Sequence, residues 1–335
     1  MTQRKLMVFQ SIFAEQMKAF ILTRQLSGSD YHSQIALLWY FDQFLVKYNF
    51  NQSTLCPEIY QQYRQSATGL APRSLGNRLS VIRQFCLFLA QTVEGSFIPE
   101  PEHHKKNYET YIPYIFTPEE IKRLLTQAKA LPGHNSPIRA KTFYTLLGLL
   151  YTTGLRVGEA RALNLSDYFK NTQRLHIRQG KFRKERWVCL SASTGKVLDD
   201  YLKERKNWST VTPDSPFFIS LRKNRISYSA IIVAFNTVLK QCSINAGNKQ
   251  HKPHLQDVRH SFAVQRLTQW YQQGIDINAH LPALSTHMGH VNIMSTQVYL
   301  HTTPQLLALV NENFHRWFLQ RIHNGGNYEH NAPIS

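Results

Sequence analysis

The residues best suited to chemistry are a tyrosine, a histidine and two arginines in the C-terminal two-thirds of the chain. Tyr299 follows His290 by nine positions. The arginines, Arg156 and Arg259, stand in the stretches Thr153-Gly154-Leu155-Arg156-Val157-Gly158-Glu159 and Asp257-Val258-Arg259-His260-Ser261-Phe262-Ala263. Two fixed cations can hold the extra negative charge of a pentavalent phosphate, because each guanidinium fork matches two phosphate oxygens. This set of side chains suits attack on a phosphodiester.

A tyrosine in this position would act as a nucleophile that joins covalently to the phosphate. A phenol is a passable leaving group, so the reverse reaction could reseal a strand without ATP. Each residue alone has a plainer interpretation, since Arg156 could pair with Glu159 or Asp167 and His290 could be structural. Their occurrence together favours an enzyme that cuts and rejoins DNA strands.

A cluster of basic residues lies between two predicted strands, over residues 178–186. It holds one acid, Glu185, and five cations: Arg178, Lys181, Arg183, Lys184 and Arg186. Such a hairpin could reach into a DNA groove, and a lysine on it could protonate a departing 5′ oxygen. The alternative is a solvated hairpin tip. Two further cations expected to contact DNA, Arg73 and Arg78, follow Pro72 in a predicted helix.

The charge balance of the chain favours a polyanionic partner. Lys and Arg number 39 against 21 acids in 335 residues, which gives a formal charge of +18. Double-stranded DNA is the expected partner. Neither an apolar run of about 18 residues nor a signal peptide is evident, so we expect a cytoplasmic protein without a membrane partner.

The cysteines and histidines do not form a recognisable metal motif. Four scattered cysteines include no Cys-x-x-Cys pair. His287 and His290 could share one helix face, but the further ligands that zinc needs are not evident. We therefore expect neither a metal nor another cofactor.

Hydrophobic spacing divides the chain into two predicted domains. Residues 8–94 carry apolar side chains at helical intervals in four segments and lack a strand signal. Residues 95–115, rich in proline and paired polar residues, indicate a linker. Residues 116–323 form the second predicted domain, and residues 324–335 a disordered tail.

The second domain is predicted to be mainly helical with a small antiparallel sheet. Its first helix should begin at Thr117-Pro118-Glu119-Glu120, a capping box. Another helix should run from Pro137 to Gly154, and Asp257 should cap the helix that carries Arg259. The remaining predicted segments are strands at 165–168, 174–178 and 186–190, and helices at 192–205, 229–242, 258–272 and 304–322.

These stretches resemble the tyrosine recombinase (phage integrase) family over nearly the whole chain. The matching motifs are the two arginine boxes, the hairpin from Gly180-Lys181 to Arg186-Trp187-Val188, the triplet Met288-Gly289-His290, and Tyr299. The resemblance implies a helical core-binding domain of the SAM-like, DNA-clamping type and a mixed α/β catalytic domain. The segment from Trp270 to Asn278 is similar to a subgroup found on mobile elements.

The resemblance also implies roles for individual residues. Tyr299 would form a 3′-phosphotyrosyl link, Arg156 and Arg259 would hold the phosphate, Lys181 would be the general acid, and His290 would position the phosphate. Members of the family act as tetramers on two duplexes, so a homotetramer or a mixed assembly with related recombinases is expected. Integration, excision or transposition of a mobile element would be the outcome.

One position departs from the family pattern. Gln256 stands three residues before Arg259, where the family usually has the histidine that accepts the tyrosine proton. An amide cannot act as a base near neutral pH, although His254 lies two residues earlier. Two alternatives to a recombinase therefore stay open: a DNA-binding relative with weak or lost catalysis, and a strand relaxer of the type IB topoisomerase kind.

Overall fold

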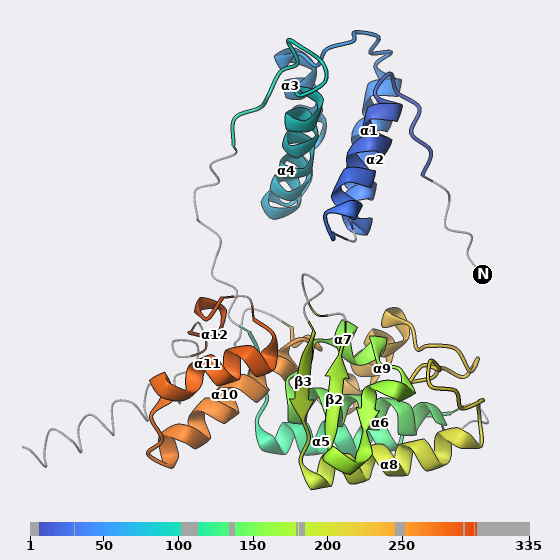
Figure 1. Cartoon of the computed structure of the whole chain (residues 1–335), viewed down its shortest axis with the longest axis vertical. Coiled ribbons are helices and arrows are strands. Elements are labelled where there is room, and N and C mark those ends of the chain that lie inside the picture. The colour runs from blue at the N-terminus through green and yellow to red at the C-terminus, as the bar shows by residue number, and fades with distance from the viewer. Residues whose placement is uncertain are drawn as a thin grey trace, which may run out of the picture. The chain divides into compact units, whose positions relative to one another are not determined.

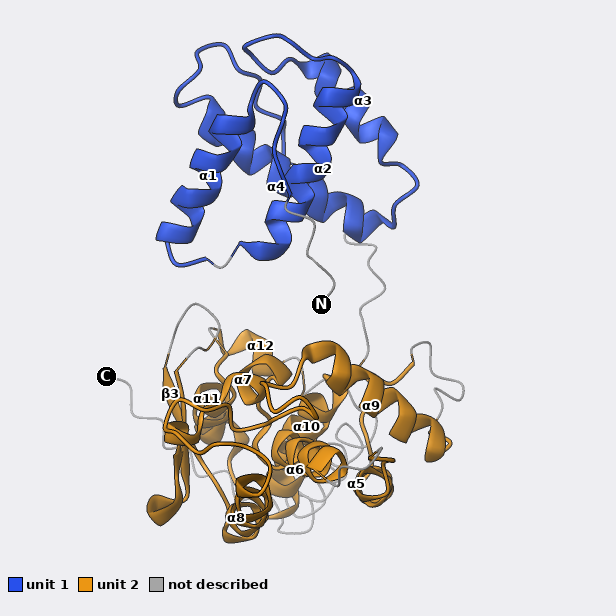
Figure 2. Cartoon of the chain, turned by 90° about the vertical axis from the view of Figure 1, so that its right-hand side faces the viewer, with its two compact units in different colours: residues 1–110 blue, residues 111–335 orange. Residues whose placement is uncertain are grey.

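The fold is described from a computed structural model. It covers residues 7–29, 31–101, 113–133, 138–178, 180, 185–244, 252–290, 292–297 and 299. The chain divides into two compact units, Met1–Thr110 and Tyr111–Ser335 (Figure 2). Several predicted features lie outside the described residues: Lys181, Arg183 and Lys184, most of the linker, the helix at 304–322 and the tail at 324–335.

The first unit is made of four helices around one apolar core. α4 packs against both α1 and α2, and interlocking rings such as Phe13, Phe20 and Phe85 fill the space between them. Proline occupies the first turn of α3 and α4, where its missing N–H is not needed. The helices are α1 (Ala14–Leu26), α2 (His32–Lys47), α3 (Pro57–Ser66) and α4 (Pro72–Leu89).

The second unit is organised around α6 (Ile138–Thr153), whose buried side chains occur on most sides of the helix. It packs against α5 (Pro118–Lys129), α8 (Ala192–Lys206) and α10 (Asp257–Gln272) (Figure 1). α5 begins with the predicted capping box, since Thr117 Oγ1 accepts from the Glu120 amide and Glu120 Oε2 accepts from the Thr117 amide. α6, which is apolar on most sides, is stable only inside a core.

A three-stranded antiparallel sheet of order β1-β2-β3 lies in the second unit. Its strands are β1 (Tyr168–Phe169), β2 (Arg174–Ile177) and β3 (Arg186–Cys189). The prediction of a strand at 165–168 is wrong for most of its length, because Leu165–Asp167 forms a 3-10 helix. The Asp167 carboxylate accepts from the Asn164 amide and so closes this turn. The predicted mainly helical fold with a small antiparallel sheet is confirmed.

The remaining helices border the sheet and α6. α10 packs against α11 (Ile277–Met288), and α11 contacts β3 (Figure 1). The prediction that Asp257 caps α10 is wrong: Gln256 is the cap residue, and Asp257 lies in the first turn, where its carboxylate accepts from the His254 amide. The other helices are α7 (Val157–Ala162), α9 (Tyr228–Gln241) and α12 (Met294–Gln297).

Candidate active site

Four of the predicted site residues are brought together by the ends of four helices. Arg156 directly precedes α7, and Arg259 lies in the first turn of α10. His290 follows Gly289, the left-handed residue (φ +68°) that ends α11, and Tyr299 follows α12. Helix ends leave main-chain groups unpaired, so side chains placed there can bind both the protein and a ligand.

Arg259 is a buried cation held by main-chain oxygens. Its side chain is only 2% exposed. Nη1 donates to the Gly154 carbonyl at 2.5 Å and Nη2 to the Met288 carbonyl at 2.8 Å. Burial, followed by repulsion from Arg156, lowers the pKa of Arg259 to about 10, so it remains protonated at neutral pH. Its position is thereby fixed before any ligand arrives.

Arg156 lies in the loop after α6 and bonds to the end of α11, two places that Arg259 also contacts. Its Nη2 donates to the Gly289 carbonyl at 3.1 Å, and its Nη1 pairs with Glu159 at 2.9 Å. The Glu159 carboxylate also accepts from the Arg156 main-chain amide, which starts α7. With its side chain 26% exposed, Arg156 is the more accessible of the two guanidiniums.

Glu159 links Arg156 to a third arginine, Arg186 on β3. Both Glu159 oxygens accept from Arg186, at 3.1 and 2.8 Å, and Arg186 Nε donates to the His287 carbonyl at 2.9 Å. The sequence suggested Arg186 as a DNA contact, but its guanidinium is engaged within the protein. Three guanidiniums and one carboxylate leave two positive charges, which favours binding of a phosphate.

Gly289 is required at its position by two features of this cluster. Its backbone is left-handed, with φ +68°. A Cβ atom there would lie 2.7 Å from Arg186 Nη1, closer than a real contact allows. Glycine is therefore the residue that lets α11 end beside the arginines.

Tyr299 lies within this cluster, with only 4% of its surface exposed. Its hydroxyl is hydrogen-bonded to His260 Nδ1 at 2.8 Å. Burial raises the pKa of the phenol, while the positive charges of Arg259 and Arg156 act in the opposite direction. The phenol is thus protonated at neutral pH.

His290 lies against the ring of Tyr299. The two rings are stacked with centroids 6.3 Å apart, and His290 Nδ1 is 2.7 Å from the buried Thr296 hydroxyl. Burial and the neighbouring charges of Arg259 and Arg156 lower the pKa of His290 to about 4. A neutral imidazole at this place can hydrogen-bond a phosphate but is a poor base.

Gln256 and His254, the two residues considered for the missing histidine, are both exposed. Gln256 lies at the start of α10, and the His254 amide donates to Asp257. The residue hydrogen-bonded to the tyrosine is instead His260, which lies in the second arginine box but was not among the predicted site residues. Its partner Tyr299 is 39 positions away, so spacing alone could not reveal the contact.

The predicted DNA-contacting residues differ in whether their charged groups already contact other side chains. Arg178 Nε pairs with Asp167 at 2.5 Å, although half of the arginine side chain is exposed. In the first unit, Arg73 is exposed, and the Arg78 guanidinium lies 4.6 Å from the centroid of the Tyr40 ring. Lys181, Arg183 and Lys184 lie outside the described residues.

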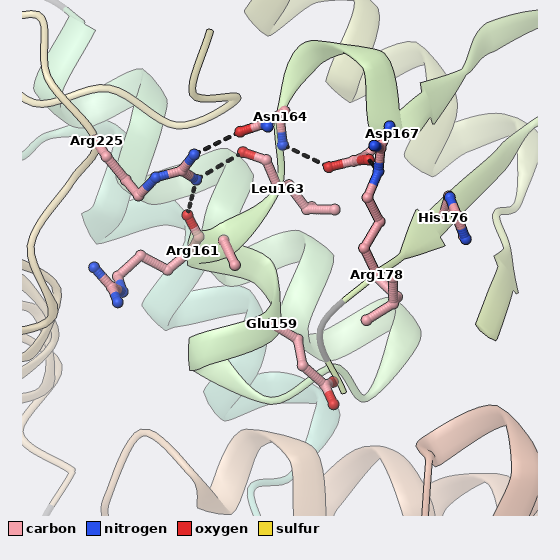
Figure 3. A pocket seen from close by; sticks show the side chains of 10 residues that line it. Glu159, Arg161, Leu163, Asn164, Asp167, His176, Arg178 and Arg225 are labelled. Atoms are coloured by element: carbon pink, nitrogen blue, oxygen red, sulfur yellow. Dashed lines mark hydrogen bonds and ion pairs between the residues drawn. The ribbon is translucent and has the colours of Figure 1, made fainter. Parts of the chain in front are cut away.

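A polar hollow of about 300 Å³ adjoins Glu159 (Figure 3). Arg225 points into it and is held by the carbonyls of Arg161 and Leu163 and by the Asn164 side chain. Arg178 is held by Asp167 at the other wall. Both cations are held by internal oxygens, and the lining of this hollow includes none of Arg156, Arg259, His290 and Tyr299.

The possible metal pair His287 and His290 is used otherwise within the described part of the chain. His287 Nε2 donates to the Thr153 carbonyl at 2.9 Å, and His290 contacts Thr296. Among the described residues, no group of three or more His, Cys, Asp or Glu side chains is placed to hold a metal ion. None of the described helices is both long and apolar enough to cross a membrane.

The chain is similar in sequence to known recombinases. Residues 115–305 match the model of the phage integrase family. The integrase/recombinase y4rB of Sinorhizobium fredii is 35% identical over 253 residues, which are 75% of this chain and 81% of that protein. Tyrosine recombinase XerC of Haemophilus influenzae is 30% identical over 248 residues, which are 74% and 76% of the two chains.

Solved structures share the fold at lower identity. The integrase of transposon Tn1549, in complex with transposon right-end DNA, aligns with a TM-score of 0.61 and 14% identity over 90% of this chain and 98% of that one. The site-specific recombinase XerH, bound to its difH substrate, aligns with a TM-score of 0.60 and 17% identity over 88% and 83%. From the sequence matches and the shared fold, the chain belongs to the phage integrase family, the tyrosine recombinases.

Proposed function

We propose that this recombinase cuts and rejoins double-stranded DNA at specific sites through a 3′-phosphotyrosyl intermediate formed by Tyr299. One observation carries the proposal: the Tyr299 phenol is buried within the electrostatic reach of two guanidiniums, Arg259 and Arg156. Arg259 is fixed by main-chain oxygens, and Arg156 has an exposed portion that a phosphate oxygen can approach. Fixed positive charge of this kind stabilises a pentavalent phosphate without rearrangement during the reaction.

The steps follow from these positions and, for Lys181, from the family resemblance. The Tyr299 oxygen attacks the phosphorus, a P–O bond to the tyrosine forms, and the bond to the 5′ oxygen breaks. Arg156 and Arg259 hold the non-bridging oxygens, His290 donates a hydrogen bond to one of them, and Lys181 protonates the leaving 5′ oxygen. Attack by a 5′ hydroxyl on the phosphotyrosine reverses the sequence and reseals the strand.

The expected assembly is a homotetramer, or a mixed assembly with related recombinases, on two duplexes. The likeness to a transposon integrase supports integration, excision or transposition of a mobile element. The proposed location is the cytoplasm of a bacterium, on its nucleoid. The expected DNA contacts outside the phosphate site are Arg73, Arg78, Arg178, Arg183 and Lys184. The core-binding domain would span residues 8–94 and the catalytic domain residues 116–323.

The test is trapping of the covalent intermediate. A pool of nicked duplexes with a randomised arm loses a short 5′ fragment on cleavage, so the reaction cannot reverse. Wild-type protein should yield adducts that survive denaturation, and their sequences would define the site. Tyr299→Phe should yield none, while Tyr228→Phe, which alters an exposed tyrosine on α9, should behave as wild type.

Gln256, in place of the family's histidine, favours a second candidate function: a DNA-binding relative that has lost catalysis. The same assay separates the two functions. If the wild type binds duplexes in the pool but gives no adduct, the recombinase proposal is refuted and the binding function is favoured. Adduct formation that persists in Tyr299→Phe would refute the assignment of the nucleophile.

A further inference from the structure

The mechanism proposed above leaves the phenolic proton of Tyr299 without an assigned acceptor. The proton has to leave as the tyrosine oxygen bonds to phosphorus. Gln256 is exposed and carries an amide, which cannot accept a proton near neutral pH. His290 is stacked on the tyrosine, and its Nδ1 is hydrogen-bonded to Thr296.

His260 has the geometry that this step needs. Its Nδ1 is 2.8 Å from the Tyr299 hydroxyl, within the range of a direct proton transfer. It lies on α10 next to Arg259, so the helix that supplies the phosphate-binding cation also places the imidazole. The two rings are tilted by 53° with centroids 5.5 Å apart, which leaves the contact at the ring edge, where an unprotonated Nδ1 carries its lone pair.

We infer that His260 is the proton acceptor for Tyr299, in place of the histidine that Gln256 replaces. This inference rests on the proposed function. As the tyrosine oxygen attacks phosphorus, its proton moves to Nδ1 of His260, and the imidazole becomes an imidazolium. On resealing, the 5′ hydroxyl attacks, the bond from phosphorus to the tyrosine breaks, and Nδ1 returns the proton to the departing phenolate.

The surroundings of His260 keep the imidazole neutral, the form that can accept a proton. Burial lowers the pKa of the imidazole, Asp257 opposes this, and Arg259 reinforces it, so the ring is neutral at neutral pH. Asp257, one turn away on α10, also offers a negative charge that would stabilise the imidazolium once formed. The other charged or titratable groups that act near it are Arg259, His290 and Tyr299.

The first experiment compares two substitutions in the full-length protein. His260→Asn retains an oxygen that can accept a hydrogen bond from the phenol but cannot take its proton, whereas His260→Ala loses both. Both variants should form adduct about 10²–10⁴-fold more slowly than wild type on a nicked duplex recovered from the pool. The matched control is His280→Asn, which changes an exposed histidine on α11 and should leave the rate unchanged.

The second experiment separates protonation of the leaving 5′ oxygen from deprotonation of the Tyr299 phenol. A nicked duplex in which sulfur replaces the bridging 5′ oxygen has a leaving group that departs without protonation. This substrate should restore cleavage by Lys181→Ala, which affects the leaving group. It should leave the defect of His260→Asn in place, because the phenol still has to lose its proton.

Gel-shift affinity and thermal unfolding of each variant show whether it binds DNA and folds, and His260→Gln replaces His260→Asn if that variant unfolds. A wild-type rate in His260→Asn, or a faster one, would overturn proton transfer, as would rescue of that variant by sulfur. In each case an active wild type leaves the proposed function intact. No adduct from wild type would overturn the proposed function, and the role of His260 with it.

Discussion

The two units differ in how many charged side chains they bury. Among the described residues, the first unit buries one charged side chain, Asp42, beneath its aromatic core. The second unit buries five: Glu159, Asp167, Arg205, Asp257 and Arg259. Asp42 accepts from the main-chain amides of Gln10 and Ser11 and so holds the segment before α1 against α2. Its burial is explained by the fold alone.

The charges of the second unit include a group that a stable fold does not require. Arg156, Arg186 and Arg259 lie around the single carboxylate of Glu159, and their mutual repulsion in a poorly hydrated site opposes folding. Clusters of this kind mark sites with a chemical task. Arg205 is the internal contrast: it also holds main-chain carbonyls, those of Thr210 and Pro216, but its pKa is lowered by burial, with Tyr201 opposing, whereas neighbouring guanidiniums act on Arg259.

The largest expected effect comes from replacing the buried arginines Arg259 and Arg205, each in turn, with methionine. Arg259→Met should slow adduct formation by about 10³–10⁵-fold, the range for an arginine that stabilises a transferring phosphoryl group. Arg205→Met should lower the free energy of unfolding, because buried carbonyls lose their donors, while folded protein cleaves normally. Single-turnover cleavage and urea unfolding measure both. Equal losses of cleavage in the two variants would erase the contrast between them.

Glu159→Gln should give the next largest effect, on stability. Removing the carboxylate leaves Arg156 and Arg186 uncompensated and should cost about 3–5 kcal/mol of unfolding free energy at neutral pH. Asp200→Asn, which breaks the exposed pair with Lys203, is the control and should cost less than about 1 kcal/mol. A Glu159 variant as stable as the Asp200 variant would contradict the assigned linking role.

The stability supplied by Glu159 should also depend on pH. Burial alone would raise the pKa of this carboxyl, but hydrogen bonds and charges from Arg186, followed by Arg156, hold it below 4.5. Because the pKa is lower in the folded state, the stabilisation is complete above pH 4.5 and is lost as the pH falls through the folded value. The difference between wild type and Glu159→Gln in urea unfolding should therefore shrink below pH 4.5.

Asp42→Asn tests the other side of the comparison, with a smaller effect. The amide keeps the shape of the side chain but offers one acceptor oxygen to the Gln10 and Ser11 amides instead of two. The first unit should lose about 1–3 kcal/mol of unfolding free energy. Cleavage of bound DNA should stay at the wild-type rate, and a slower rate in fully folded protein would show that the first unit influences the chemistry.

Gln256→His should have the smallest effect. The position is exposed, and the inferred acceptor His260 already contacts Tyr299. Adduct formation should change by less than about tenfold, well under the 10²–10⁴ that a general base contributes. An acceleration of more than about tenfold would indicate that the exposed position 256, and not His260, limits the reaction.

Much of the fold was predictable because its signals are local. The prolines of α3 and α4 and the capping box of α5 fix where those helices begin, whatever the rest of the chain does. The segment 165–168 misled the prediction, since it contains Asp167, whose carboxylate closes a turn on Asn164. A bond between a side chain and the main chain three residues away overrode the local preference for a strand.

The sequence by itself determined the family, the mainly helical fold and the set of candidate residues, because arginine boxes and helical periodicity are read over a few neighbouring positions. Only the tertiary structure decided which groups meet. Arg186 turns inward to Glu159, 27 positions away, and His260 meets Tyr299 across 39 positions. Such contacts depend on how α10, α11 and β3 pack, and packing of distant elements sets distances that no local pattern contains.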